Sequence, residues 1–232
     1  RIAERIDANL LNISMEDLAM LNRKLFNDKI TTLQNKTTGT LIIKEYPTAS
    51  AHTGHIRTLI NELALKRTFK PDIIFVDYIN ICASARFKPG SNVNSYTYIK
   101  AIAEEMRGLA VELDLPIVTA TQTTRTGFVS TDIGLEDTSE SFGLPATADF
   151  MFALISSEEL ERAGQMLVKQ LKNRYNDPTL NRKFIIGVDR ARMKLFDIEQ
   201  AAQNLIQPEE QKYVEHNSKD KETEEKYKDF NF

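Results

Sequence analysis

The chain has 232 residues, of which 41% are hydrophobic and 27% charged, and its formal net charge at pH 7 is −3. This composition is that of a globular protein that can bury a sizeable core, and it excludes the uniformly basic surface of a protein that coats DNA by itself. A single cysteine excludes an internal disulfide framework and a zinc site built from cysteines. No apolar run approaches the roughly 18 residues that span a bilayer, so we expect no membrane segment.

Two helices are expected near the N-terminus. An apolar residue at every fourth position predicts the first, over residues 1–11. Ser14, with Asp17 three residues on, is typical of a helix N-cap and predicts a second helix that continues to Leu25. The first helix has no capping residue before it and the chain has no initiating methionine, so we expect a truncated N-terminus.

The next elements alternate between strand and helix. Residues 40–46 are rich in β-forming side chains and predict a short strand, and Thr53 can cap a helix that ends near Arg67. The run from Pro71 to Asp77 is apolar up to its final carboxylate. Continuously apolar strands are buried on both faces, which indicates a parallel sheet covered by helices.

The remaining elements complete an α/β pattern. A long amphipathic helix is expected over residues 95–114, and further apolar strands over residues 116–120 and 149–155. Three more short strands lie close together in the sequence and indicate antiparallel pairing at one sheet edge, namely residues 165–171, 183–188 and 193–198. The order predicts an α/β fold with a mainly parallel sheet, helices on both faces and an antiparallel edge extension.

The C-terminal end differs in composition from the rest. Residues 207–232 are charged and nearly free of aliphatic side chains. Such a segment cannot bury enough apolar surface to offset the entropy of ordering. We therefore expect one domain over residues 1–206 and a disordered tail over residues 207–232.

Two polar side chains end two of the predicted parallel strands. Asp77 ends the first, and a carboxylate there points into the crevice where α/β proteins bind ligands. In a nucleotide-hydrolysing motor such a carboxylate holds Mg²⁺ beside the phosphates. Gln122 ends the next strand and could sense the γ-phosphate or orient water. The plainer alternatives are that Asp77 caps a turn and that Gln122 only opens a loop.

Two basic side chains follow the predicted strand 165–171. Alternation along the strand direction places Lys172 and Arg174 on one face. Two cations on one face could grip phosphates, and an arginine from a neighbouring subunit could neutralise transition-state charge. An ordinary solvated basic face is the alternative.

The segment 123–143 is too long for an ordinary connection and is rich in Thr, Ser and Gly. Its backbone N–H groups, its hydroxyls and Arg125 could bind a nucleic-acid phosphate backbone, although a plain surface loop has the same composition.

One motif is missing from the sequence. The phosphate-binding pattern G-x-x-x-x-G-K-[ST] does not occur. Without its backbone donors and lysine, the chain by itself is not expected to hold a triphosphate tightly. His52 and His55 are three residues apart but have no third ligand beside them, so we expect no metal site there.

Four segments together resemble the DnaB-class hexameric replicative DNA helicases, with those of T-even-like phages as the nearest group. The resemblance extends over about residues 1–200. PDIIFVDYINIC is similar to the family's Walker B segment, PIVTATQ to the strand that ends in a nucleotide-sensing glutamine, DTSESFGLPATADF to the end of the DNA-binding loop, and KQLKNRY to the trans-acting motif. The four segments follow one another in the family's order.

The resemblance implies a RecA-like P-loop NTPase core that uses ATP and Mg²⁺. It assigns Asp77 to the metal, Gln122 to nucleotide sensing, Arg174 to the arginine finger and Lys172 to its companion. By the same match, the residues near the single-stranded DNA backbone are Ser139, Glu140, Phe142 and Gly143, to which the loop composition adds Arg125. Many bacterial members have arginine and glycine near the loop end where Ser139 and Phe142 stand, so the DNA contacts can differ.

The resemblance also implies a homo-hexameric ring that moves 5′→3′ on one DNA strand. A primase and a helicase loader are the expected partners, and the cytoplasm of a bacterium or of a phage-infected cell is the expected location. The phosphate loop and the catalytic glutamate would lie upstream of Arg1. Two other readings stay open: a different RecA-like ATPase, such as a recombinase or a clock-type ring, and a degenerate subunit that assembles without hydrolysis.

Overall fold

The computed structural model describes residues 1–87, 92–123, 134–135, 143–177, 180 and 182–198. These residues form two compact units. The first unit has residues 1–35 and 156–168 and the described residues from 183 on; the second has residues 36–155 and 169–182. No helix among the described residues is both long and apolar enough to cross a membrane.

Three helices begin the chain: α1 (Ile2–Leu11), α2 (Met15–Met20) and α3 (Arg23–Lys36). Ser14 caps α2 as the sequence predicts, because its hydroxyl oxygen accepts a hydrogen bond from the Asp17 N–H at 3.0 Å. The expected single helix through Leu25 is wrong. Leu21 adopts an extended backbone that ends α2. Asn22 then starts α3, since its side-chain oxygen accepts from the Leu25 N–H at 2.9 Å.

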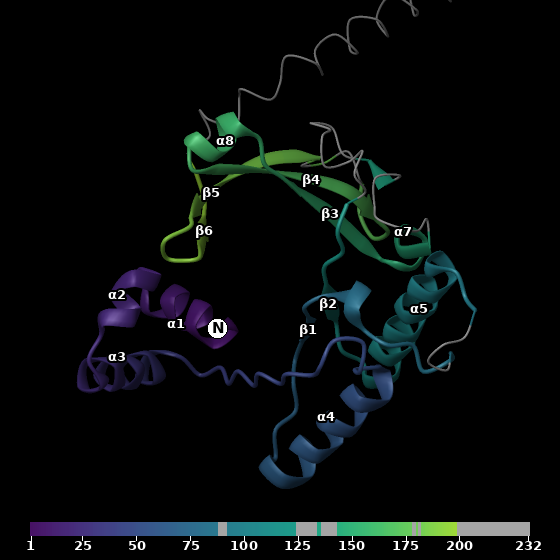
Figure 1. The fold of residues 1–232 in the computed structure, drawn as a ribbon, viewed down its shortest axis with the longest axis horizontal. Coiled ribbons are helices and arrows are strands. Elements are labelled where there is room, and N and C mark those ends of the chain that lie inside the picture. The colour runs from purple at the N-terminus through teal and green to yellow at the C-terminus, as the bar shows by residue number, and fades with distance from the viewer. Residues whose placement is uncertain (88–91, 124–133, 136–142, 178–179, 181, 199–232) are drawn as a thin grey trace, which may run out of the picture. The chain divides into compact units, whose positions relative to one another are not determined.

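The second unit contains a parallel strand pair and the helices beside it (Figure 1). Its elements are α4 (Thr53–Arg67), β1 (Ile74–Val76), the 3-10 helix η1 (Ile79–Ile81), α5 (Ser95–Leu113), β2 (Ile117–Thr119), α7 (Gly143–Thr147) and β3 (Phe150–Ile155). β1 and β2 pair in parallel, with Phe75 opposite Val118. The predicted parallel core is therefore confirmed for this pair.

The core of the second unit forms along α5. Asn94 caps this helix by accepting from the Thr97 N–H at 2.8 Å. The long amphipathic helix predicted over residues 95–114 is confirmed, and its Ile102 is only 1% exposed. The buried cluster that contains this residue comprises Ile79, Cys82, Ile99, Ile102, Ala103, Met106 and Leu144. The segment that follows Asp77 and the helix α7 are thus both packed on α5.

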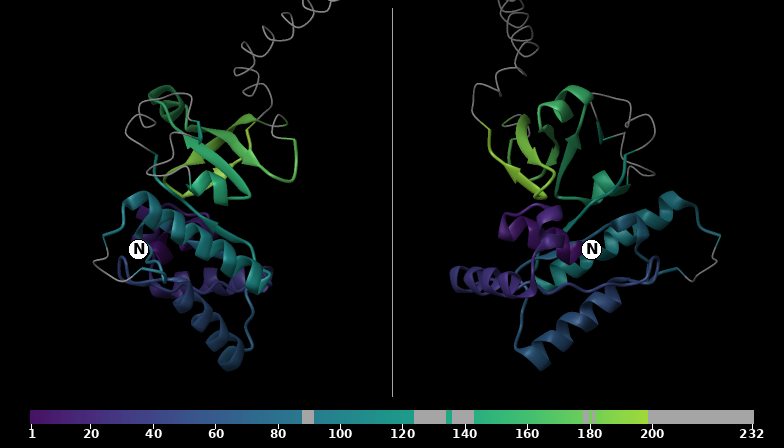
Figure 2. Two further views of the ribbon diagram at one scale, coloured as in Figure 1. Left: turned by 90° about the vertical axis from the view of Figure 1, so that its right-hand side faces the viewer. Right: turned by 60° about the vertical axis from the view of Figure 1, so that its left-hand side comes forward.

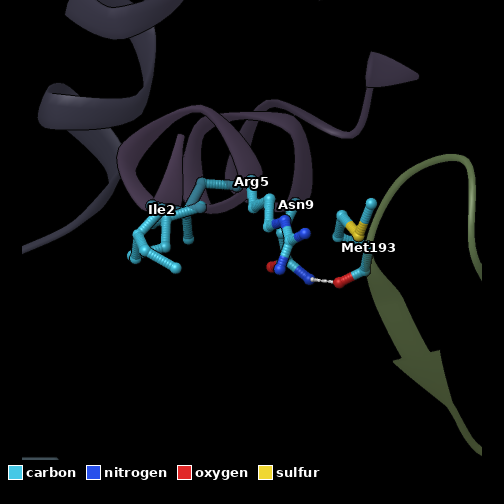
Figure 3. Close-up of a pocket in the computed structure, with 6 residues that line it drawn as sticks. Ile2, Arg5, Asn9 and Met193 are labelled. Atoms are coloured by element: carbon cyan, nitrogen blue, oxygen red, sulfur yellow. Dashed lines mark hydrogen bonds between the residues drawn. The ribbon is translucent and has the colours of Figure 1, made fainter. Parts of the chain in front are cut away.

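Strands β3 to β6 form a second, four-stranded sheet in the order β3-β4-β5-β6. Figure 2 shows its green strands from two further sides. The later strands are β4 (Gln165–Asn173), β5 (Lys183–Asp189) and β6 (Lys194–Phe196), and α8 (Glu158–Arg162) lies between β3 and β4 in the chain. β5 and β6 are antiparallel, as the short spacing predicts, with Gly187 opposite Phe196. β3, expected beside the parallel strands, hydrogen-bonds instead within this sheet.

Three further expectations differ from the structure. Residues 40–46 form no strand, and Leu41 is 59% exposed. A β-rich segment becomes a strand only when a partner strand takes its backbone groups, and no described residue supplies one. The β1–β2 pair is not buried on both faces, since Phe75 is 69% exposed. The cap of α4 is His52, whereas the predicted cap Thr53 is its first, buried residue.

Candidate nucleotide edge and cation cluster

The first candidate site lies at the carboxyl ends of β1 and β2. The strands run in the same direction with Val76 opposite Thr119, so both end at one edge. Asp77 follows β1, and Gln122 follows β2 within three residues. The Gln122 amide nitrogen lies 3.5 Å from the Tyr78 hydroxyl oxygen. The structure thus brings both strand ends that carry the predicted polar residues to one edge. We call Asp77, Gln122 and the strand ends that carry them the nucleotide edge.

Hydrogen bonds between the two strand ends fix this edge. The Ile79 N–H donates to the Ala120 carbonyl oxygen at 3.2 Å. The Thr121 hydroxyl donates to the Asn80 side-chain oxygen at 2.9 Å. Asp77 and Gln122 themselves are both exposed. The backbone is therefore braced while the two polar side chains are open to a ligand.

Asp77 supplies a carboxylate at the nucleotide edge, an oxygen ligand of the kind that Mg²⁺ takes. Among the described residues, no group of three or more His, Cys, Asp or Glu side chains gathers to hold an ion. A cation at Asp77 would thus take one carboxylate from this part of the chain. Mg²⁺ commonly keeps several waters and binds one or two carboxylates together with substrate phosphates.

The two histidines near α4 are engaged in capping. The His52 Nδ1 accepts from the Gly54 N–H at 3.0 Å, and the His55 Nδ1 accepts from the His52 N–H at 3.3 Å. Both rings therefore take part in the N-terminal cap of α4 through Nδ1.

The second candidate site is a cluster of three cations around one carboxylate, all in the second unit. Asp149 lies just before β3. Its Oδ1 accepts from Arg107 of α5 at 2.7 Å and from Arg174, just after β4, at 2.9 Å. The Arg174 backbone N–H also donates to the Asp149 carbonyl oxygen at 3.0 Å. Arg174 and Asp149 are therefore joined through both backbone and side chain.

Lys172 binds the end of α7. Its ammonium group donates to the carbonyl oxygens of Pro145 at 2.5 Å and Ala146 at 3.3 Å. Arg107 donates to the next carbonyl oxygen, that of Thr147, at 2.5 Å. The last carbonyls of a helix have no partner within the helix and carry its negative dipole end, so cations stabilise them. We call Arg107, Asp149, Lys172 and Arg174 the cation cluster.

Electrostatics in the cation cluster follow from its composition. Partial burial would raise the pKa of Asp149, but the hydrogen bonds and charges of Arg107 and then of Arg174 outweigh this effect and lower it below its usual range. The pKa of Lys172 is lowered, first because burial disfavours the charged form and then because Arg174 repels it. With three cations and one carboxylate, the cluster has an excess of two positive charges, which suits an anionic ligand.

Of the residues predicted to contact DNA, the structure describes only Gly143. Arg125, Ser139, Glu140 and Phe142 lie outside the described residues. Gly143 is described, and it is the buried first residue of α7. The helix that leaves the predicted DNA segment is therefore the one that Lys172 and Arg107 hold at its other end.

Sequence reasoning missed Asp149 and Arg107. Asp149 precedes an apolar strand, and Arg107 lies on the polar side of α5. Neither position belongs to a spacing pattern that marks a site, and the two meet only because α7 packs on α5. One signal could have indicated that Asp149 pairs with Arg174. It is a carboxylate directly before one strand together with a K-x-R pattern at the end of the next strand.

The parallel pair with polar strand ends, the four-stranded sheet and the flanking helices agree with the expected RecA-like fold. Two solved structures share it, each with a TM-score of 0.67 and each matching 84% of this chain. One is an ATPase domain, 16% identical and matched over 69% of its length. The other is a DnaB-like replicative helicase, studied with its interactions with primase, 17% identical and matched over 48% of its length.

Sequence comparison assigns the family. The DnaB-like helicase C-terminal domain matches residues 1–170. The DnaB-like replicative helicase of Enterobacteria phage T4 is 43% identical over a stretch that covers 93% of this chain. The chain therefore belongs to the DnaB-like helicase family and corresponds to its C-terminal domain. It spans about half of that curated relative, 48% of its length.

Proposed function

We propose that this chain is the motor portion of a replicative DNA helicase that uses ATP to move along single-stranded DNA and unwind the duplex at the replication fork. The observation that carries the proposal is the nucleotide edge, where Asp77 and Gln122 follow adjacent parallel strands. Membership in the DnaB-like helicase family supports it. The replicative function of the phage relative supports the place at the fork.

In this proposal, the nucleotide edge serves the ATP bound by the same subunit. Asp77 would hold Mg²⁺, and Gln122 would contact the γ-phosphate or orient the attacking water. Bound Mg²⁺ would neutralise charge that develops on the phosphates during hydrolysis. The hydrogen bonds from Ile79 and Thr121 support these roles, because they keep the two strand ends in place while the side chains stay exposed.

Arg174 acts on the ATP of a neighbouring subunit in a homo-hexameric ring, and Lys172 assists it. An arginine donated across an interface stabilises transition-state charge. The positive excess of the cation cluster supports this assignment, as does the 49% exposure of the Arg174 side chain, which can reach outward. Lys172 would have to leave the carbonyls of α7 to reach a phosphate.

Single-stranded DNA is the proposed nucleic-acid ligand. Arg125, Ser139, Glu140, Phe142 and Gly143 would lie along its backbone in the channel of the ring, which needs little net charge when backbone N–H groups and hydroxyls contribute. A primase and a loader are the proposed partners, and the bacterial or phage-infected cytoplasm is the proposed location. One relative of known structure was studied with primase.

The test uses the full-length protein with a forked DNA duplex. We expect ATP hydrolysis that single-stranded DNA stimulates, and strand displacement that requires ATP. Asp77→Asn should abolish both while the ring still assembles, because the change removes the carboxylate for Mg²⁺ and keeps its shape. Strand displacement by the Asp77→Asn protein would contradict the proposal. A filament in place of a ring, seen by electron microscopy, would favour a recombinase.

The 232-residue chain on its own is expected to hydrolyse ATP poorly, since its sequence has no G-x-x-x-x-G-K-[ST] pattern. Turnover by the isolated chain equal to that of the full-length protein would show that the triphosphate is held by other groups.

A further inference from the structure

Arg174 is held by contacts that the proposed function does not use. Arginine is a long side chain that samples many rotamers when nothing restrains it, and fixing it for a reaction costs entropy. Here the Arg174 Nη1 donates to the Asp149 Oδ1 at 2.9 Å, and its backbone N–H donates to the Asp149 carbonyl oxygen at 3.0 Å. Its direction is therefore set before any ligand arrives.

The contact leaves Arg174 able to bind an anion. A guanidinium has five N–H donors in a planar fork, and the side-chain bond to Asp149 uses one nitrogen. The Arg174 side chain is 49% exposed, whereas that of Asp149 is 34% exposed. Asp149 thus holds the arginine from the inner side while the remaining donors stay open to solvent.

Asp149 is itself held from the other side. Its Oδ1 also accepts from Arg107 at 2.7 Å, and the same Arg107 nitrogen donates to the Thr147 carbonyl oxygen at the end of α7. α7 begins at Gly143, the last residue of the segment assigned to DNA. A continuous set of hydrogen bonds therefore leads from the end of α7 through Arg107 and Asp149 to Arg174.

We propose that Asp149 is the positioning residue of the trans-acting arginine: its carboxylate aims Arg174 at the neighbouring subunit's nucleotide and, through Arg107, joins that arginine to α7. This role rests on the proposed function of Arg174. Asp149 touches neither the nucleotide nor the reacting atoms. It acts through Arg174, so its loss damages the site of the neighbour and leaves the site of its own subunit intact.

The test is made in rings of the full-length protein and compares damage to the neighbouring subunit's ATP site with damage to the subunit's own ATP site. Asp149→Asn removes the charge and keeps the shape. We expect kcat for ATP to fall roughly ten- to a hundredfold, as for a misaimed catalytic group, with the KM for ATP changed by no more than about twofold. Glu112→Gln is the matched control, because it changes a carboxylate beside Arg57 elsewhere on α5, in an exposed pair. It should leave both constants unchanged.

Mixed rings then locate the defect. Asp77→Asn subunits cannot hydrolyse their own ATP but donate an intact Arg174. Asp149→Asn subunits have an intact ATP site but donate a misaimed Arg174. In a random equal mixture, about a quarter of interfaces join an intact site to an intact donor. Hydrolysis should therefore recover well above that of either variant alone. Arg174→Ala mixed with Asp77→Asn should recover in the same way.

The outcomes separate the two assignments. Recovery with Arg174→Ala but not with Asp149→Asn would overturn the role of Asp149 and leave the trans-acting arginine standing. No recovery in either mixture would overturn the trans assignment itself. A wild-type kcat in Asp149→Asn rings would also refute the positioning role.

A folding defect is checked by melting temperature against Glu112→Gln. If Asp149→Asn melts early, Asp149→Glu replaces it, because this change keeps the charge and moves the carboxylate by one methylene. The same loss and recovery are expected. Kinetic constants equal to those of the control would overturn the proposal.

Discussion

The histidine cap of α4 gives a sharp prediction about stability. The His52 Nδ1 accepts from the Gly54 N–H at 3.0 Å, and the His55 Nδ1 accepts from the His52 N–H at 3.3 Å. His52→Ala removes the first bond and the ring that stands 4.0 Å from the His55 ring. Loss of an N-cap costs about 1 kcal/mol, so the free energy of unfolding should fall by roughly that amount.

Gly54 provides an independent measure of the same cap. A Cβ at this position would lie 2.7 Å from the His52 Cε1, so Gly54→Ala would force the ring aside. Alanine is favoured over glycine in a helix by up to about 1 kcal/mol, which offsets the lost cap in the wild-type background. In the His52→Ala background no ring is in the way, and Gly54→Ala should stabilise. The cycle thus predicts a coupling energy of about 1 kcal/mol.

Urea unfolding of the wild type, His52→Ala, Gly54→Ala and the double variant, followed by circular dichroism, measures this coupling. His52→Asn is the control, because asparagine accepts the same backbone bond and should keep most of the stability. Equal effects of Gly54→Ala in both backgrounds would refute the reasoning.

Three further outcomes are expected. Ile102→Ala should lower the free energy of unfolding by about 2–5 kcal/mol, because removing a side chain that is only 1% exposed leaves a cavity. Val111→Ala, at a position 75% exposed, should change it little. Equal effects of the two changes in urea titrations would contradict the packing along α5. The pKa of Asp149 is lowered in the folded chain, so its stabilisation is present above the unfolded pKa of about 3.9 and disappears as the pH falls through the folded pKa. The free energies of unfolding of the wild type and of Asp149→Asn, measured against pH, should therefore converge in acid. Deleting residues 207–232 should leave the melting temperature unchanged, and a large drop would show that this charged segment packs on the fold.

Local patterns in the sequence predicted most of the elements. The apolar face of α5, the Ser14 cap and the pairing of β5 with β6 each depend on residues close together in the chain, and each is confirmed. Errors arose where the outcome depends on a distant partner. Residues 40–46 have the side chains of a strand but no partner strand among the described residues. His52 replaced Thr53 as a cap because its ring can reach the Gly54 N–H, which propensity rules for caps do not consider.

The candidate sites divide in the same way. The placement of Asp77 and Gln122 at one edge could be predicted because strand ends are visible in a sequence and parallel strands end together. The link from Asp149 to Arg107 spans 42 positions and depends on how α7 packs on α5, which no periodicity encodes. The K-x-R spacing singled out Lys172 and Arg174, and the resemblance implied their roles, whereas the contact that holds each of them required the three-dimensional structure.

The length of α5 has a mechanical consequence. Its 19 residues, at about 1.5 Å each, make a rod about 28 Å long. Glu105 on this rod accepts hydrogen bonds from Ser84 and Ala85, in the segment that leaves the nucleotide edge. Arg107, two residues further, holds the end of α7. Because both attachments are on one helix, a displacement of α5 would move the segment after Asp77 and the end of α7 together.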